Sequence, residues 1–266
     1  ACVGYTAGAG ANDIVEVLTG TYTPSTPIGG NNDQSFPSGT SWNAPFILRC
    51  KTGNTCTVRG TGAQNVYLTN TGAMYATIGA GTSAATGGFV FNGVNLSSDQ
   101  VFMGTCCQSP SSVELLGNEF INTNHENAIY VGNFGSDVRL RYNYIHGGTF
   151  TTTANGNGRN HAIYYTANNG LIEYNRIDDI PGYGYHGYYA TDASNNIIRR
   201  NWIKNFALES GTGCGILTTR SNNIVYENIV WANTGGSTNG QIGLCNSGSG
   251  NLFYNNTVYG MSYIGM

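Results

Sequence analysis

Charged side chains are scarce in this chain. Asp, Glu, Lys and Arg make up 9% of its 266 residues, against roughly 25% in ordinary globular domains. The sequence also contains almost no stretches of Glu, Lys and Leu, the residues that favour helices. Together, these two shortages argue against a helical fold.

Long apolar runs and a strong charge imbalance are also missing. No apolar stretch approaches the length needed to cross a membrane. A net charge of −3 means that the chain lacks the excess of basic residues with which proteins bind nucleic acid. The sequence shows no nucleotide-binding loop, no zinc-ligand spacing and no nucleophile elbow. We therefore predict neither a membrane span nor a nucleic-acid partner.

The chain does contain a short phrase that returns seven times. The copies are FNGVNL (91–96), LLGNEF (115–120), RLRYNYI (139–145), LIEYNRI (171–177), IIRRNWI (197–203), IVYENIV (224–230) and LFYNNTV (252–258). Six copies carry an asparagine at one register position: Asn118, Asn143, Asn175, Asn201, Asn228 and Asn256. Val94 is assigned to this position in the first copy, and successive positions lie 24 to 32 residues apart. Such a period is typical of stacked units that cannot bury their apolar faces alone.

Apolar residues flank each asparagine at fixed distances, three positions before it and two positions after it. The apolar runs are short, β-branched and separated by Gly, Asn and Ser, which is typical of strands. We expect both columns to stack in a core, with rungs roughly 4.8 Å apart. Asparagine amides on successive rungs can donate and accept hydrogen bonds, and asparagine tolerates the left-handed backbone of such turns. The sequence therefore predicts an all-β parallel solenoid with an internal asparagine ladder.

The organisation expected is one solenoid domain over residues 1–266, with its N-terminal coils in 1–60. Only ten residues follow Asn256, and they form no polar capping segment. An uncapped last rung is an edge that templates pairing with another chain. We therefore expect further chain, a loop or a neighbouring molecule to cover it, and end-to-end self-association is one such arrangement.

The chain contains seven cysteines, and their arrangement is evidence on the cellular compartment of the protein. Cys50 and Cys56 flank a short turn-forming loop and could bridge without strain. Cys214 and Cys245 fall on successive rungs at nearby but not identical offsets, so pairing between them is possible. Combined with the low charge, this usage indicates an oxidising, extracellular setting. Because the chain starts at Ala1 without a methionine, we expect that a targeting segment has been removed.

Several longer phrases resemble those of a known group of proteins. They are GTYTP, SGTSWNAPFILRCKTGNTCTVRGTG, RNHAIYYTANNGLIEYNRI, PGYGYHGYY and NNTVYG. Together they cover nearly the whole chain and are similar to the right-handed parallel β-helix repeat proteins. That group includes the pectate-lyase-like superfamily of polysaccharide lyases, hydrolases and uronate epimerases. The resemblance implies a right-handed coil, and it makes an acidic polysaccharide the expected partner.

A stretch rich in histidine and tyrosine follows the longest repeat step. The asparagine register places five residues in approximately one column: Asn127, His161, His186, Cys214 and Gln241. This column makes the two histidines rung neighbours. The polar insertion 147–159 ends just before them, and a long loop on a solenoid usually borders the binding face.

Cleavage of a uronate by β-elimination needs a base, an acid and a cation, and tyrosine rings can stack on sugars. We therefore predict a catalytic set comprising His161, His186, Arg159, Lys204 and Arg220. The predicted substrate-binding set comprises Tyr164, Tyr165, Tyr185, Tyr188, Tyr189 and Asp192. Two alternatives stay open at this point. The rings can form an ordinary stacked exterior column, or the solenoid can bind glycans or build filaments without catalysis.

Most other charged residues fit structural ladders. They are Arg141, Glu173 and Arg199, two residues before the asparagine, and Arg200 and Glu227, one residue before it. Opposite charges on neighbouring strands attract each other. We therefore predict ion-pair ladders on the surface.

Asp178 and Asp179 are adjacent carboxylates in the phrase RIDDIPGYG. Calcium takes oxygen ligands of this kind, so a calcium site is one interpretation. Two carboxylates are too few to define a site, and a solvated turn is the favoured interpretation. No metal ligand is therefore assigned.

Overall fold

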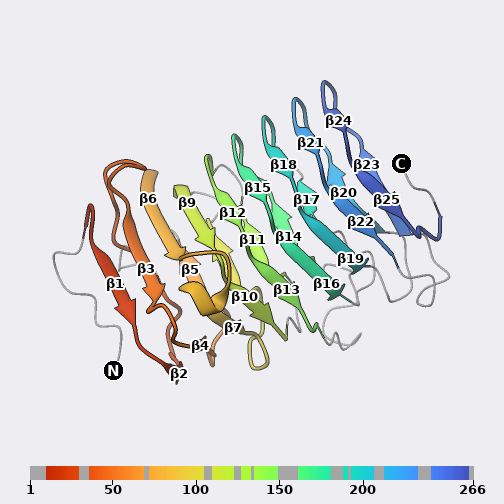
Figure 1. The fold of residues 1–266 in the computed structure, drawn as a ribbon. Helices are drawn as coiled ribbons and strands as arrows, with labels where there is room; N and C mark the ends of the chain where they lie inside the picture. The colour runs from red at the N-terminus through yellow and green to blue at the C-terminus, as the bar shows by residue number, and fades with distance from the viewer. Residues whose placement is uncertain are drawn as a thin grey trace.

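The computed structural model describes residues 10–29, 36–68, 72–104, 110–122, 127–132, 135–148, 161–180, 188–190, 193–206, 213–232 and 241–263. Over these residues the chain coils through three parallel β-sheets, here called A, B and C (Figure 1). The helical structure among them is the single 3-10 turn η1 (Ala84–Thr86). No helix in this part of the chain is therefore long and apolar enough to cross a membrane.

Among the described residues, successive coils add one strand to sheet A and one to sheet B, and all but the first and last coils add one to sheet C. Sheet A contains, in order, β1 (Ile14–Val17), β3 (Phe46–Cys50), β6 (Gly72–Gly79), β9 (Pro110–Leu116), β12 (Arg139–Arg141), β15 (Leu171–Glu173), β18 (Ile197–Arg199), β21 (Ile224–Tyr226) and β24 (Leu252–Tyr254). Sheet B contains β2 (Gly20–Tyr22), β4 (Cys56–Val58), β7 (Val90–Asn92), β10 (Glu119–Ile121), β13 (Tyr144–His146), β16 (Arg176–Ile180), β19 (Trp202–Phe206), β22 (Ile229–Trp231) and β25 (Thr257–Tyr259). Sheet C contains β5 (Val66–Leu68), β8 (Val101–Met103), β11 (Ile129–Val131), β14 (Ile163–Tyr165), β17 (Tyr188–Ala190), β20 (Gly213–Thr218) and β23 (Gln241–Asn246).

The repeated phrase forms a strand of sheet A, a tight turn and the following strand of sheet B. In LIEYNRI, Ile172 on β15 and Ile177 on β16 point inward and are 2% exposed. They align with Ile198 and Ile203 on the next rung. The two predicted apolar columns are therefore core columns, because alternate residues of a strand face opposite sides of its sheet.

The asparagines at these turns are joined by side-chain hydrogen bonds. Asn143 Nδ2 donates to Asn175 Oδ1 at 3.0 Å, and Asn175 Nδ2 donates to Asn201 Oδ1 at 3.0 Å. The same bond continues at 3.0 Å from Asn201 to Asn228 and from there to the last asparagine of the row. Asn175 Nδ2 also donates to a main-chain carbonyl of the preceding rung at 2.7 Å. Buried amides paired in this way avoid the cost of an unmade hydrogen bond, about 1–3 kcal/mol each.

The first copy of the phrase was placed in the wrong register. Strand β7 pairs Phe91 with Phe120, so Phe89 occupies the position of Asn118, and Val94 does not. The Phe89 N–H donates to Asn118 Oδ1 at 3.0 Å. The stacking of Phe91 on Phe120 in the core, with ring centroids 5.2 Å apart, accounts for this alignment.

The left-handed backbone of these turns lies one residue before the asparagine. The residues with positive φ are Gly117, Tyr142, Tyr174, Arg200, Glu227 and Asn255. Non-glycine residues are strained in this region, and their side chains interact with those of neighbouring rungs. Tyr142 and Tyr174 stack with ring centroids 4.8 Å apart, and Arg200 pairs with Glu227 at 2.6 Å. The asparagine therefore contributes hydrogen bonds, and the residue before it contributes the turn.

A second asparagine row, which the sequence analysis missed, lies at the turns from sheet C to sheet A. The Asn196 N–H donates to Asn223 Oδ1 at 3.0 Å, and Asn223 Nδ2 donates to Asn251 Oδ1 at 3.1 Å. Asn196 Nδ2 also donates to the Ala167 carbonyl at 3.1 Å. Two of the three turns of each coil in the C-terminal half are thus held by amide rows.

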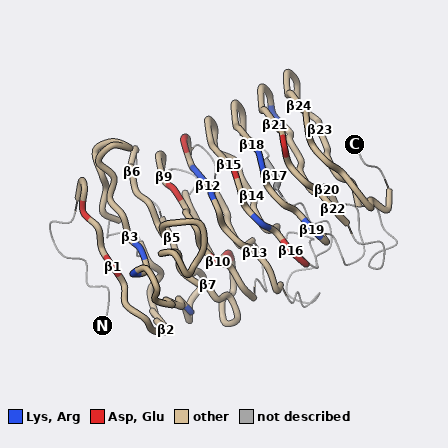
Figure 2. The backbone as a smooth tube through the Cα atoms, viewed as in Figure 1, with Lys and Arg blue, Asp and Glu red and all other residues tan. Residues whose placement is uncertain are grey.

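The predicted ion-pair ladder on sheet A is present. Glu173 accepts from Arg141 at 2.7 Å and from Arg199 at 2.6 Å. Figure 2 shows acidic and basic positions alternating from strand to strand between β9 and β18 of this sheet. The disulfides Cys50–Cys56 and Cys214–Cys245, which the spacing made possible, are formed as well.

Candidate functional site

His161 lies at the turn that leads into sheet C, one rung after Asn127, as the column predicted. Its N–H donates to Asn127 Oδ1 at 3.2 Å, and its ring meets Tyr164 edge-on with centroids 5.4 Å apart. The residue is 6% exposed. Little of the imidazole is therefore accessible to a polymer outside the coil.

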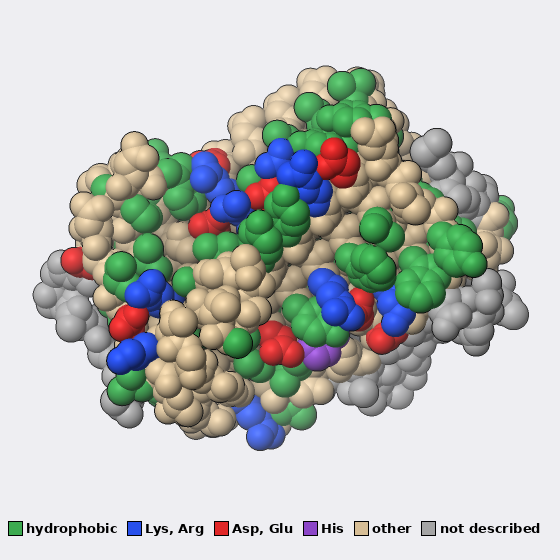
Figure 3. Space-filling model, in the orientation of Figure 1, with side chains coloured by type: hydrophobic (Ala, Val, Ile, Leu, Met, Phe, Trp, Pro, Cys, Tyr) green, Lys and Arg blue, Asp and Glu red, His purple; other side chains and the backbone are tan. Residues whose placement is uncertain are grey.

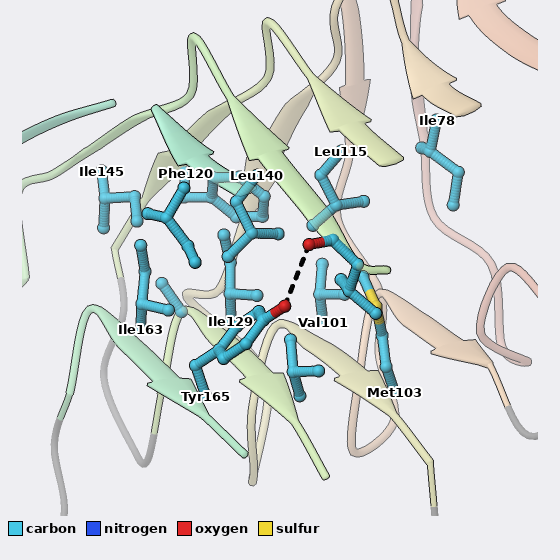
Figure 4. Packing of buried hydrophobic residues seen from close by; sticks show 14 of the residues in the cluster. Ile78, Val101, Met103, Leu115, Phe120, Ile129, Leu140, Ile145, Ile163 and Tyr165 are labelled. Carbon is cyan, nitrogen blue, oxygen red and sulfur yellow. Dashed lines mark hydrogen bonds between the residues drawn. The ribbon is translucent and has the colours of Figure 1, made fainter. Parts of the chain in front are cut away.

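Tyr165 points into the core, so its predicted contact with substrate is wrong. The residue is 0% exposed, and its hydroxyl donates to the Val138 carbonyl at 2.9 Å. Figure 4 shows the ring among Ile129, Ile163 and Met103. The physical reason is strand alternation: Tyr164 faces outward on β14, so its neighbour must face inward.

Tyr164 belongs to a row of aromatic rings on the outer face of sheet C. The rings of Tyr67, Phe102, Tyr130 and Tyr164 stack in sequence, with centroid distances of 5.3, 4.7 and 5.1 Å. Stacking covers ring faces that a sugar would otherwise contact. The row matches the alternative of an exterior stacked column, and a substrate role for Tyr164 stays a prediction.

The two predicted cations that the structure describes, Lys204 and Arg220, do not gather around His161. Lys204 lies on β19 of sheet B, whereas His161 precedes a strand of sheet C. Arg220 follows β20, at the opposite end of the sheet C strands from His161. The structure therefore does not bring these three residues to one place.

The other predicted site residues are largely outside the described part of the chain. Arg159, His186, Tyr185 and Asp192 fall there, as does most of the insertion 147–159. Tyr188 and Tyr189 lie on β17, where the backbone alone is described, and Tyr189 aligns with Tyr164. Their proposed contacts with a substrate stay predictions.

The outer face of sheet B carries a different group of reactive side chains, here called the His146 cluster: Glu119, Tyr144, His146, Arg176 and Asp178. They come from the consecutive strands β10, β13 and β16, whose registers place them in two adjacent outward rows. Figure 3 shows a histidine among basic and acidic side chains in the lower half of the view, in the region where Figure 1 labels β13 and β16. Sequence analysis missed the cluster, although its members occupy the first and third positions after the ladder asparagine.

His146 and Glu119 form a polar pair across neighbouring strands. Nε2 of His146 is 2.7 Å from Oε1 of Glu119. Because an ionised carboxylate only accepts, the imidazole N–H at Nε2 donates this bond, which leaves Nδ1 as the basic nitrogen of the neutral ring. Both side chains are partly open to solvent, at 28% and 31%. This pair therefore provides an accessible base whose ring is held by a carboxylate.

Tyr144 stacks against His146, with ring centroids 3.9 Å apart. Its hydroxyl donates to Asp178 Oδ2 at 3.2 Å. Burial, followed by the charge of the Asp178 carboxylate, raises the pKa of the Tyr144 phenol above its ordinary value. The phenol therefore keeps its proton at neutral pH, as a proton donor must.

Arg176 completes the cluster with a fixed positive charge. Its Nε donates to Asp178 Oδ2 at 2.6 Å, and its guanidinium carbon lies 4.7 Å from the centre of the Tyr144 ring. The hydrogen bond to Asp178 raises the pKa of Arg176, so the charge persists at every relevant pH. The side chain is 57% exposed, which leaves it open to an anionic group outside.

Asp178 and Asp179 do not form a solvated turn, so that interpretation is wrong. Both lie on strand β16, and Asp178 is only 3% exposed. Asp179 accepts from Asn205 Nδ2 at 2.6 Å. Within the described residues, no group of three or more His, Cys, Asp or Glu side chains is placed to hold a metal ion.

Comparison with known proteins identifies the fold. The right-handed β-helix region family matches residues 50–258. The chain belongs to the right-handed β-helix family. No curated protein and no solved structure matches it. Membership of the β-helix family defines the coil and its hand, whereas chemistry must be argued from side chains.

Proposed function

We propose that this β-helix protein is an extracellular lyase that cleaves an acidic polysaccharide by β-elimination on the outer face of sheet B. One observation carries the proposal: the Glu119-bound imidazole of His146 stacks directly on the proton-retaining phenol of Tyr144. Arg176 adds the fixed cation beside them. A base, an acid and a cation are the three groups that elimination from a uronate requires.

In the proposed reaction, Nδ1 of His146 removes the proton alpha to the uronate carboxylate. The electron pair of that C–H bond forms a carbon–carbon double bond, and the bond to the neighbouring glycosidic oxygen breaks. The Tyr144 phenol gives its proton to the leaving oxygen. Arg176 stabilises the carboxylate as negative charge builds on it. Exchange with solvent then returns the proton from His146 to Tyr144.

The proposed extracellular location rests on two features of the chain. The disulfides Cys50–Cys56 and Cys214–Cys245 are formed, and such bonds persist in oxidising compartments. Charged residues are also few, at 9% of the chain. An acidic polysaccharide outside the cell is a substrate that such a compartment supplies.

The test is turnover of pectin, alginate and glycosaminoglycans, followed by the ultraviolet absorbance of the unsaturated uronate product. His146→Gln should lower turnover by roughly 10²–10⁴-fold, and His161→Gln should leave it unchanged. Circular dichroism and thermal melting check that both variants fold. A loss confined to His161→Gln would return the site to the sheet C column. Binding of these polymers without any product would favour the non-catalytic glycan-binding alternative.

A further inference from the structure

Beyond the His146 cluster, the outer face of sheet B becomes aromatic. Trp202 lies on β19 and Trp231 on β22, and their rings meet edge-on with centroids 6.4 Å apart. Tyr259, on β25, is 69% exposed, and Trp202 is 40% exposed. Figure 3 shows hydrophobic side chains gathered beside the charged ones toward the C-terminal end of this face. Large exposed rings are costly to leave in water and suit contact with a ligand.

Lys204 stands among these rings. It is the register partner of Trp231, and its Nζ lies 5.4 Å from the centre of a Trp231 ring. A cation held by the negative face of an aromatic ring keeps its N–H groups available as donors. Trp231 therefore positions the ammonium without neutralising it.

The charge of Lys204 is not matched by a carboxylate in the described part of the chain. Six arginines form ion pairs there: Arg49, Arg139, Arg141, Arg176, Arg199 and Arg200. No ion pair joins Lys204 to any described residue. Asp178 is its register partner on the other side, but that carboxylate accepts from Arg176 and Tyr144. Lys204 thus adds an uncompensated positive charge to its row.

We propose that Lys204, Trp202 and Trp231 form a binding subsite for a uronate residue of the substrate. The exposed indole of Trp202 contacts the apolar face of the pyranose ring, and the ammonium, held beside Trp231, binds its carboxylate. This inference rests on the proposed function, because it places the subsite on the same polymer that the His146 cluster cleaves. A neutral sugar would stack on the aromatic rings but would offer no carboxylate to the ammonium of Lys204.

The spacing along the coil fits a single extended chain. Strand β19 is two rungs beyond β13, so the subsite is displaced from His146 by roughly 10 Å along the coil axis. A polysaccharide lying parallel to this axis reaches both places at once. We expect this contact to bind the ground state and the transition state equally, and such uniform binding lowers KM without raising kcat. Loss of Lys204 should therefore raise KM and leave kcat unchanged.

The test measures binding separately from turnover. The probes are oligogalacturonate and the same oligosaccharide with its carboxylates reduced to alcohols, each titrated against tryptophan fluorescence. In the His146→Gln background, where no substrate is consumed, Lys204→Gln should weaken binding of oligogalacturonate about tenfold. It should leave the weaker binding of the reduced probe unchanged. Lys51→Gln, at an exposed turn after β3, is the matched control and should change neither.

Each other result overturns the subsite. Equal binding of both probes by the unaltered site would show that the charge of Lys204 does not select the ligand. Undiminished binding of oligogalacturonate by Lys204→Gln, or no binding of it at all, would do the same. Failure of the lyase proposal is recognised independently, because it removes product formation and leaves the carboxylate-dependent binding and its loss in Lys204→Gln intact.

Discussion

Sheets A and B both carry arginine, carboxylate and tyrosine on their outer faces, but the two faces use them differently. On sheet A, Glu173 lies between Arg141 and Arg199, and Arg199 donates onward to the Tyr226 hydroxyl at 2.6 Å. Glu173 is 2% exposed, and each of its oxygens accepts from an arginine. Both oxygens of this carboxylate are therefore paired within the row.

On sheet B, the corresponding groups are paired less completely. The Arg176 side chain is 57% exposed, against 31% for Arg141 and 29% for Arg199 on sheet A, and Oδ1 of Asp178 has no hydrogen-bond partner among the described residues. Satisfied polar networks make a fold rigid, whereas incompletely satisfied ones mark places of functional interest. One repeat thus produces a structural ladder on one face and a candidate reaction site on the next.

A matched pair of tyrosines gives the largest expected difference between the faces. Tyr144 and Tyr226 each lie under an arginine, at 4.7 Å and 5.8 Å from the guanidinium carbon. Tyr144→Phe should lower kcat by roughly 10²–10⁴-fold, because it removes the proposed general acid. Tyr226→Phe should leave kcat unchanged. Steady-state kinetics on the polymer that is turned over measures both.

The control is that both variants lose one hydroxyl and retain the ring. Equal losses of kcat in the two would show that the substitution acts through the packing of the coil. Unchanged kcat in Tyr144→Phe would remove this residue from the proposed mechanism.

A pair of glutamates should separate stability from activity. Glu173→Gln leaves two arginines without their carboxylate and should lower the free energy of unfolding by about 3 kcal/mol, with little change in turnover. Glu119→Gln alters a pair that is about one third exposed, so its stability cost should be below about 1 kcal/mol. Because it no longer stabilises the protonated imidazole of His146, turnover should fall about tenfold or more. Urea denaturation and steady-state kinetics on both variants measure the two effects.

The opposite pattern would reverse the comparison. If Glu119→Gln unfolds the protein more readily than Glu173→Gln does, sheet B is the structural face. A turnover loss in Glu173→Gln at full stability would extend the site onto sheet A.

Much of the fold was predictable because the repeat period makes equivalent residues neighbours. The core columns and the charge ladder follow from spacing alone, as Ile172 and Glu173 illustrate, whereas for the disulfides spacing showed only that pairing was possible. The register of the first copy was predicted wrongly because Phe89 and Phe91 form a second apolar alternation. The register is decided by which of the two alternations packs against the adjacent rung.

The site was harder to predict, because the coil has three outer faces and the register alone does not say which one is open. The tyrosines near His161 in the sequence led us to predict a catalytic role for it, yet the structure buries this residue. The sequence alone could have predicted that only one of Tyr164 and Tyr165 faces outward, since consecutive strand residues face opposite sides. His146 and Asp178 share one column, but their partnership with Glu119 and Arg176 depends on side-chain conformations that spacing does not encode.

The smallest expected effect is a pH dependence that belongs to sheet B. Burial and the nearby Asp178 carboxylate raise the pKa of Tyr144 in the folded protein. Between the ordinary phenol pKa and this raised value, the unfolded chain loses the proton while the folded chain retains it. The unfolded state then binds fewer protons, so the free energy of unfolding falls as the pH rises through this window. Below the ordinary phenol pKa, Tyr144 contributes no such dependence. Urea titrations at a series of alkaline pH values should show a steeper decline in wild type than in Tyr144→Phe, and parallel curves would mean that neither burial nor Asp178 raises the pKa of this phenol.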